Sequence, residues 1–234
     1  MIITDASSIS EHLRAHSAQD DTQRQAQRMC SSAPVVQYDP QNWQGRMQKN
    51  NNCYDYALNL QFEKQVFLDP GMIAFARGDV GFDDLAFYDD KSLSIAEFQK
   101  RVNEMACADG LTQIPALAET SNMMGREIAL TTSATQFHFG WDYHWLRKDA
   151  DGLWSHKTGE EPVRRIADVV TEMRDNAASI TQLAQSLPVH NQFSSRFLVP
   201  KSGVMPENKQ DVIDAYDDYC KYRTKIRKSG IVIP

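Results

Sequence analysis

Hydrophobic residues recur at three- and four-residue steps in one segment of the chain. The positions that keep this spacing are Ile95, Phe98, Val102 and Met105. Such steps place the side chains on one face of an α-helix. Ser94 and Glu97 form a capping-box pattern in front of the segment, and Gly110 suits the residue after its end. The pattern therefore predicts a helix over about 95–108.

Shorter apolar runs predict strands. Residues 127–132 favour one strand, and residues 139–148 and 153–157 favour two more. The last two are separated by the segment Asp149–Gly152, which is typical of a hairpin turn. Residues 196–200 predict a further strand that ends at a proline.

The remaining segments complete an α+β chain. Residues 166–186 and about 209–227 predict helices, and the second of these is mostly charged. Residues 71–92 contain three glycines and several aspartates, which predicts a long loop over the site described below. The expected divisions are a polar, weakly helical arm (1–34), a central domain (35–200) and a charged C-terminal helix and tail (201–234).

Composition narrows the class of protein. The chain has 234 residues, of which 41% are hydrophobic, enough for a real core. Its formal net charge of −6 argues against a general nucleic-acid binder, because phosphate contacts need a surplus of Lys and Arg. No apolar run reaches the length of a membrane span, and the first residues lack the features of a secretory signal peptide. We expect a protein that is cytoplasmic as made, and any export would use a signal-independent secretion system.

The cysteines do not suggest a disulfide framework or a zinc site. The four, widely spaced and without a C-x-x-C pair, are Cys30, Cys53, Cys107 and Cys220. A cysteine taken at random is more often a small buried residue than a nucleophile.

Cys53 differs from the other three in its context. Three asparagines precede it, and a segment that can be helical through about Lys64 follows it. Asparagine is a favoured helix N-cap, so the pattern predicts a thiol at a helix N-terminus. The free N–H groups and the dipole there favour the thiolate, which is the nucleophilic form.

Two histidines on the predicted hairpin supply a candidate base. His144 lies on the first strand between Tyr143 and Trp145, and His156 follows twelve residues later on the second strand. Residues related in this way across a tight turn can form a cross-strand pair, in which one imidazole holds the other. Two half-buried histidines bonded to backbone would give the same pattern without any catalytic role.

This arrangement resembles the papain-like cysteine hydrolases, and among them the NlpC-type cell-wall peptidases. The residues that carry the resemblance are the N-C-x-x-x-A start at Asn52 and the two hairpin histidines, within about 35–165. The resemblance implies a nucleophile helix packed on a small antiparallel sheet, with extra helices at both ends. It also implies Cys53 as nucleophile, His144 as base and His156 as the orienting residue, with no metal or organic cofactor.

The surroundings of Cys53 depart from that family. The NlpC-type signature is D-C-S-G, whereas Tyr54 and Asp55 follow the cysteine here and change the space and charge beside it. We expect Tyr54, Asp55, Trp145 and Asp142 to face the substrate. The resemblance therefore supports the catalytic residues of this chain more strongly than it supports peptidoglycan as the substrate.

Other assignments of these residues remain open. Asp142 is an alternative partner for His144, ranked below His156. His138, His144 and His156 contain enough imidazoles for zinc, but a zinc site leaves Cys53 unexplained. Tyr38 is a candidate near the oxyanion site, for which the backbone N–H of Cys53 is the better donor.

The favoured function is a cysteine-dependent amide hydrolase that cleaves peptide bonds of bacterial peptidoglycan, as a secreted antibacterial effector or toxin. Expected partners are the substrate peptide and a secretion carrier or immunity protein, with no nucleic acid and no membrane span. The first alternative is a protease, deamidase or acyltransferase that acts on a protein. The second is a non-enzymatic binding module in which the cysteine and histidines are structural.

Overall fold

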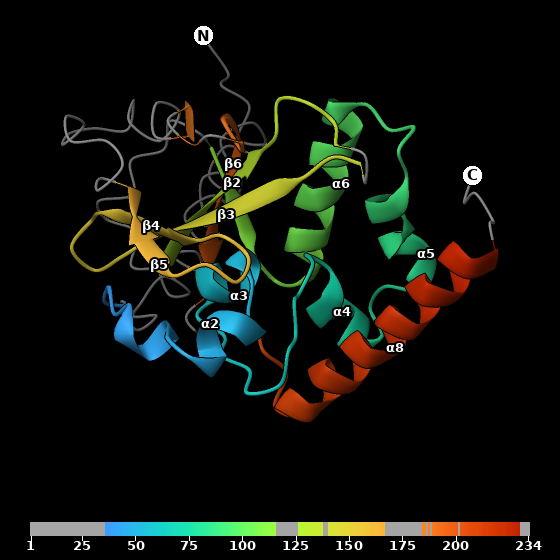
Figure 1. Cartoon of the computed structure of the whole chain (residues 1–234), viewed down its shortest axis with the longest axis horizontal. Helices are drawn as coiled ribbons and strands as arrows, with labels where there is room; N and C mark the ends of the chain where they lie inside the picture. Colours follow the sequence, from blue (N-terminus) through green and yellow to red (C-terminus); the bar gives the residue numbers. More distant parts are fainter. Residues whose placement is uncertain are drawn as a thin grey trace, which may run out of the picture.

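The computed structural model describes residues 36–115, 126–137, 140–166, 184–185, 187, 189–200 and 202–229. Within these residues, one antiparallel sheet has the strand order β1-β6-β2-β3-β4-β5 (Figure 1). The strands are β1 (Thr112–Ile114), β2 (Arg126–Thr132), β3 (Tyr143–Lys148), β4 (Trp154–Lys157), β5 (Val163–Arg165) and β6 (Gln192–Val199).

The helices of the described residues are mostly short. They are η1 (Gln41–Trp43), α2 (Arg46–Asn50), α3 (Cys53–Leu58), α4 (Met72–Arg77), α5 (Phe82–Leu85), η2 (Ala86–Asp89), α6 (Ile95–Ala108) and α8 (Lys209–Ser229). Helix α6 has the predicted bounds, and Ser94 and Glu97 form the predicted capping box. Helix α8 confirms the predicted C-terminal helix. The mixture of helices with an antiparallel sheet confirms the α+β class.

Two predicted segments differ in the structure. Helix α3 ends at Leu58, not near Lys64, because Asn59 adopts a left-handed conformation (φ 55°) and its N–H bonds to the carbonyl of Tyr56. Residues 71–92 form α4, α5 and η2 in place of a long loop. The glycines at 71 and 78 adopt left-handed conformations at the two ends of α4, so they cap a helix whose apolar side chains enter the core.

The predicted hairpin is confirmed, with β3 and β4 joined by residues 149–153, but β3 begins at Tyr143, later than the predicted start at residue 139. The register places Leu146 opposite His156, so His144 lies diagonally across from His156. Strand β2 is confirmed, and β6 begins at Gln192, earlier than the predicted strand of 196–200. The predicted arm of 1–34 lies outside the described residues, as does most of the predicted helix of 166–186.

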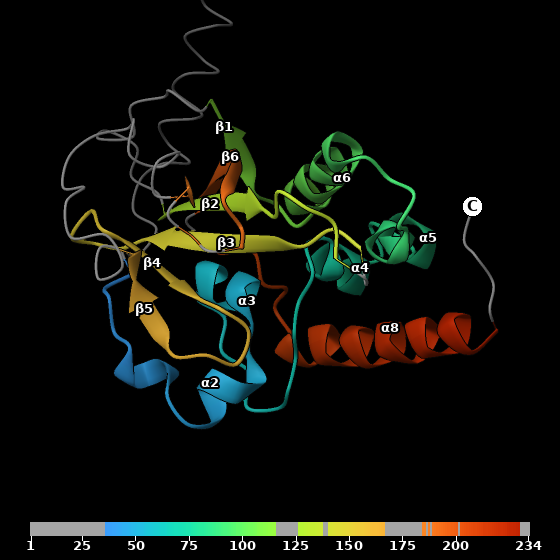
Figure 2. The ribbon, with the colours of Figure 1, turned by 45° about the horizontal axis from the view of Figure 1, so that its top comes forward.

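The two faces of the sheet bury different hydrophobic clusters. The main cluster joins side chains of α3, α4, α6 and α8 to one face of β2, β3 and β6, including Leu130, Trp145 and Phe197. The opposite-face cluster consists of Ala129, Leu146, Trp154, Ile166 and Leu187. Figure 2 shows α3 against β3 and α8 running beside α4, and both pairs are in contact. This packing fixes the start of α3 against the strand that carries His144.

A buried charge network fastens α3 to the hairpin. Arg147 of β3 is fully buried, and its guanidinium group donates to the Tyr56 hydroxyl at 2.7 Å and to the Asp149 carboxylate at 2.8 Å. The same guanidinium group lies 3.9 Å from the centre of the Tyr56 ring. Arg165 of β5 donates to the other oxygen of Asp149 at 2.9 Å. Each buried charge of this network is therefore paired, because an unpaired charge is costly in the low-dielectric interior.

Candidate active site

The asparagine run builds the start of α3. Asn52 is the N-cap, and its side-chain oxygen accepts the backbone N–H groups of Tyr54 (2.9 Å) and Asp55 (3.0 Å). Asp55 accepts the backbone N–H of Asn52 at 2.8 Å, which completes a capping box. Cys53 therefore occupies the first helical position, as the sequence predicted.

The asparagine amides also bind the segment that follows α3. Asn51 donates to the carbonyl of Phe62 (3.1 Å) and accepts its N–H (2.8 Å). Asn50 donates to the carbonyl of Glu63, and Asn52 donates to that of Leu68. From the sequence these asparagines were expected only to cap the helix, because their other partners lie more than ten residues away in the chain.

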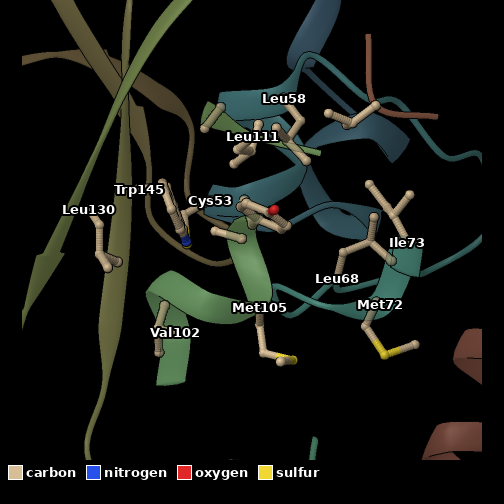
Figure 3. Close-up of a cluster of buried hydrophobic side chains, with 14 of the residues drawn as sticks. Cys53, Leu58, Leu68, Met72, Ile73, Val102, Met105, Leu111, Leu130 and Trp145 are labelled. Atoms are coloured by element: carbon tan, nitrogen blue, oxygen red, sulfur yellow. The ribbon is translucent and has the colours of Figure 1, made fainter. Parts of the chain in front are cut away.

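The Cys53 thiol lies in the main cluster, 8% exposed, beside Trp145 (Figure 3). Burial raises the pKa of Cys53 to about 12, and the carboxylates of Asp142, Asp55 and Asp69 act in the same direction. A backbone hydrogen bond from Trp145 to the thiol lowers it in part. The helix start was expected to favour the thiolate, but desolvation outweighs that effect, so the thiol is protonated at neutral pH.

His144 and His156 form the pair that the hairpin predicted. His144 Nε2 lies 2.9 Å from His156 Nδ1, and the two rings meet edge to face with centroids 5.1 Å apart. His144 is 2% exposed. Burial lowers the pKa of His144 well below 6.5, and His156 and His190 lower it further. Burial, then Arg164 and His190, lower the pKa of His156 to about 4, so both rings are neutral at pH 7.

The structure places α3 in contact with the β3–β4 hairpin, but the Cys53 thiol does not contact the histidine pair through a hydrogen bond. The thiol takes a hydrogen bond from the backbone of Trp145, the residue next to His144. Side chains alternate along a strand, so Trp145 faces the main cluster with Cys53 and His144 faces the other side. Among the described residues, no hydrogen bond links Cys53 to His144 or His156.

Three of the four residues expected to face the substrate are fully buried: Tyr54, Asp55 and Trp145. The Tyr54 hydroxyl donates to Asp109 at 2.8 Å, and its ring packs 5.0 Å from that of Trp145. Asp55 is the capping residue already described, also fully buried. These positions do not agree with substrate contact, since none of the three residues is exposed to solvent.

Asp142 keeps part of its side chain exposed, as expected of a substrate-facing residue, whereas Tyr38 packs in another cluster. Asp142 remains 37% exposed in its side chain, and its carboxylate accepts a hydrogen bond from His190 Nε2 at 2.8 Å. It therefore holds a histidine other than His144. The Tyr38 ring lies 3.9 Å under the guanidinium group of Arg165 and packs beside Trp43 and Tyr56, away from the thiol.

Two residues near the site were not singled out from the sequence. His190 stacks on the His144 ring, with centroids 5.2 Å apart and an interplanar angle of 24°. Lys157 is fully buried, and its ammonium group donates to the carbonyls of Asn51 and Gly159. His190 had no local signal, because it reaches the site from a segment distant in the chain. Lys157 directly follows His156, so its place on the hairpin could be expected from the sequence.

The described residues contain no group of three or more His, Cys, Asp or Glu side chains arranged to hold a metal ion. His138, which the zinc alternative needed, lies outside them. A search of the same residues finds no helix with the length and apolar character of a membrane span.

Comparison with known proteins gives one informative relative. No family model matches the chain, and no solved structure matches it. The insoluble matrix shell protein 1 of Ruditapes philippinarum is 32% identical over 148 residues, which cover 62% of this chain and 78% of that protein. With that identity over most of the relative's length, the chain belongs to the same family as insoluble matrix shell protein 1.

Proposed function

We propose that the chain is a cysteine-dependent amide hydrolase with a papain-like arrangement, in which Cys53 is the nucleophile, His144 the base and His156 the orienting residue. One observation carries the proposal: a hydrogen-bonded pair of neutral imidazoles lies on a hairpin whose backbone contacts a thiol at the first position of a helix. A nucleophile, a base and a group that orients the base are the parts that such catalysis requires.

The proposed reaction assigns one task to each group. With His144 Nε2 engaged by His156 Nδ1, Nδ1 of His144 is the nitrogen assigned to the thiol proton. Sulfur then bonds to the amide carbonyl carbon, and the backbone N–H of Cys53 stabilises the oxyanion. The C–N bond breaks as His144 returns the proton to the leaving amine. Water, deprotonated by His144, hydrolyses the thioester and releases the acid and the free thiol.

The proposal requires one rearrangement of the described state. Cys53 is protonated and buried, and no hydrogen bond joins it to His144. The thiol must reach the His144 ring before proton transfer, and a substrate must reach the thiol. A neutral thiol and a neutral imidazole are the protonation states expected before general-base activation, in contrast to a preformed thiolate–imidazolium pair.

The substrate class follows from the resemblance to NlpC-type peptidases. Peptide amides of bacterial peptidoglycan are the first substrates to test, with export as an antibacterial effector as part of the same proposal. A protein target, cleaved, deamidated or acylated, is the alternative within the same chemistry.

Digestion of purified peptidoglycan, followed by mass spectrometry of the released muropeptides, tests the proposal. We expect Cys53→Ala and His144→Ala to lower turnover on the order of 10³-fold or more. Cys107→Ser, at an exposed thiol on α6, is the matched control and should retain activity. Circular dichroism of each variant shows whether the fold is kept. Full hydrolysis by folded Cys53→Ala would refute the mechanism.

A second candidate is a non-enzymatic component of an insoluble matrix. The name of the relative supports this candidate, and so does the burial of the Cys53 thiol. It predicts that no amide substrate is turned over, and that wild type and Cys53→Ala form sedimentable material at the same rate. Centrifugation of the purified chains over time measures that rate.

A further inference from the structure

His190 closes the side of the histidine pair that His156 leaves open. It lies just before β6, distant in the chain from β3 and β4. Its ring is nearly parallel to that of His144, at 24° with centroids 5.2 Å apart. His156 contacts the same ring at an interplanar angle of 88°. His144 is therefore held by one imidazole edge to face and by another in a stack.

Asp142 anchors His190 at this position. Its Oδ2 accepts the Nε2–H of His190 at 2.8 Å, and its Oδ1 accepts the backbone N–H of Tyr143 at 2.9 Å. The carboxylate is thus fixed to the start of β3, two residues before His144. The side chain of His190 is only 12% exposed. The start of β3 therefore anchors His190 through Asp142, and the same strand carries His144, on which His190 stacks.

We propose that His190, anchored by Asp142, is a positioning residue for His144 that fixes the plane of its ring and opposes a second positive charge beside it. This inference rests on the proposed function only for its catalytic consequence. The contacts among the three rings exist whatever reaction the chain performs.

The charges around His144 support this role. The titratable groups that face it are His156 from β4 and His190 from the segment before β6. Arg164 of β5 acts on His156, and Asp142 pairs with His190. On the other face of β3, the Cys53 thiol is uncharged at neutral pH. Two stacked imidazoles cannot both carry charge without a large penalty, and His190 lowers the pKa of His144. His144 therefore stays neutral, as a general base must.

The test follows the ring of His144 directly by NMR in the full chain, with labelled histidine titrated from pH 8 to pH 4. His190→Phe keeps a stacking ring but removes the ionisable imidazole and its bond to Asp142. His190→Ala removes the ring as well. In both variants we expect the midpoint of the His144 titration to move upward by about one pH unit. Asp83→Asn, at an exposed acid on α5, is the control and should leave it unchanged.

The activity assay then connects this effect to catalysis. In His190→Phe, the acid limb of the kcat/KM profile should move upward by the same amount as the NMR midpoint. An NMR midpoint in His190→Phe equal to that of wild type would overturn the inference. Because the titration needs no substrate, the outcome stands even if the chain proves to have no hydrolase activity. Should His190→Ala fail to fold, the near-isosteric His190→Phe decides the matter.

Discussion

The two faces of β3 are both buried, but they carry different kinds of side chain and make different contacts. On the face toward α3, Trp145 and Arg147 are fully buried, and Arg147 bonds to Tyr56 and Asp149. On the opposite face, the described polar contacts of His144 and His156 are mainly with other histidines. The first face joins secondary-structure elements, and the second gathers titratable rings.

This difference shows how the alternation of side chains along a strand places neighbouring residues in different environments. The thiol belongs to the packed face, where burial raises the pKa of Cys53 to about 12. The imidazoles belong to the opposite face, where burial and mutual contact keep them neutral. Helix α3 and the hairpin are in contact, while the thiol and the imidazoles lie on different faces of β3.

The largest expected effect is on the packed face. Trp145→Ala should reduce the free energy of unfolding by about 3–5 kcal/mol, because it leaves a cavity beside Cys53 and Leu130. Urea denaturation of the purified chain measures this loss. Trp154→Ala, in the opposite-face cluster and 8% exposed, is the matched variant and should cost less. Equal losses would mean that the two faces are packed equally well.

The next effect concerns the thiol. Since burial raises the pKa of Cys53 from its ordinary value of 9.0 to about 12, its thiolate fraction falls on the order of 10³-fold. Iodoacetamide should therefore alkylate Cys53 at least about 10³-fold more slowly in the native chain than in urea.

Peptide mapping by mass spectrometry reads each thiol separately. Cys107 is exposed, so its native and unfolded rates should differ far less. A native rate for Cys53 that matches that of Cys107 would show a thiolate at the helix start and restore the expectation from sequence.

The smallest effect is the response of the histidine face to acid. The folded pKa of His156 is about 4, below its ordinary value of 6.5, so the unfolded chain binds the proton first. Stability is therefore full above about pH 6.5 and is lost as the pH falls toward 4, by about 2 kcal/mol for this group. Urea denaturation at pH 7 and pH 4.5 measures the loss.

His156→Gln is the control for this response, and it should lose less stability than wild type between the two pH values. Burial raises the pKa of Asp109 to about 6, so its contribution runs in the opposite direction over the same range. That contribution is the same in both proteins and cancels in the comparison. Identical pH dependence in the two proteins would contradict the neutral histidine pair.

Much of the local structure followed from sequence, because its causes are local. The capping box at Ser94 and the apolar steps after it defined α6 to the residue. The Asp149–Gly152 turn defined the hairpin. The asparagine before Cys53 placed the thiol at a helix start. Each of these signals acts over a few residues, so no knowledge of distant partners was needed.

Other features depended on contacts that the sequence does not display. The end of α3 at Leu58 depends on the left-handed conformation of Asn59. The folding of residues 71–92 into short helices depends on how their apolar side chains pack in the main cluster. The environment of Tyr54 and Asp55 was misread for the same reason. Both looked available to substrate, but both are fully buried, with hydrogen bonds from Tyr54 to Asp109 and from Asn52 to Asp55.

The sequence by itself determined which residues start α3 and which histidines share the hairpin, and therefore that a thiol and two imidazoles belong to these elements. Only the tertiary structure decided which face each side chain occupies and how deeply it is buried. Those two facts set the protonation of Cys53 and His144, because desolvation and neighbouring charge depend on the whole set of packed elements. They also brought His190, from a distant segment, onto the ring of His144.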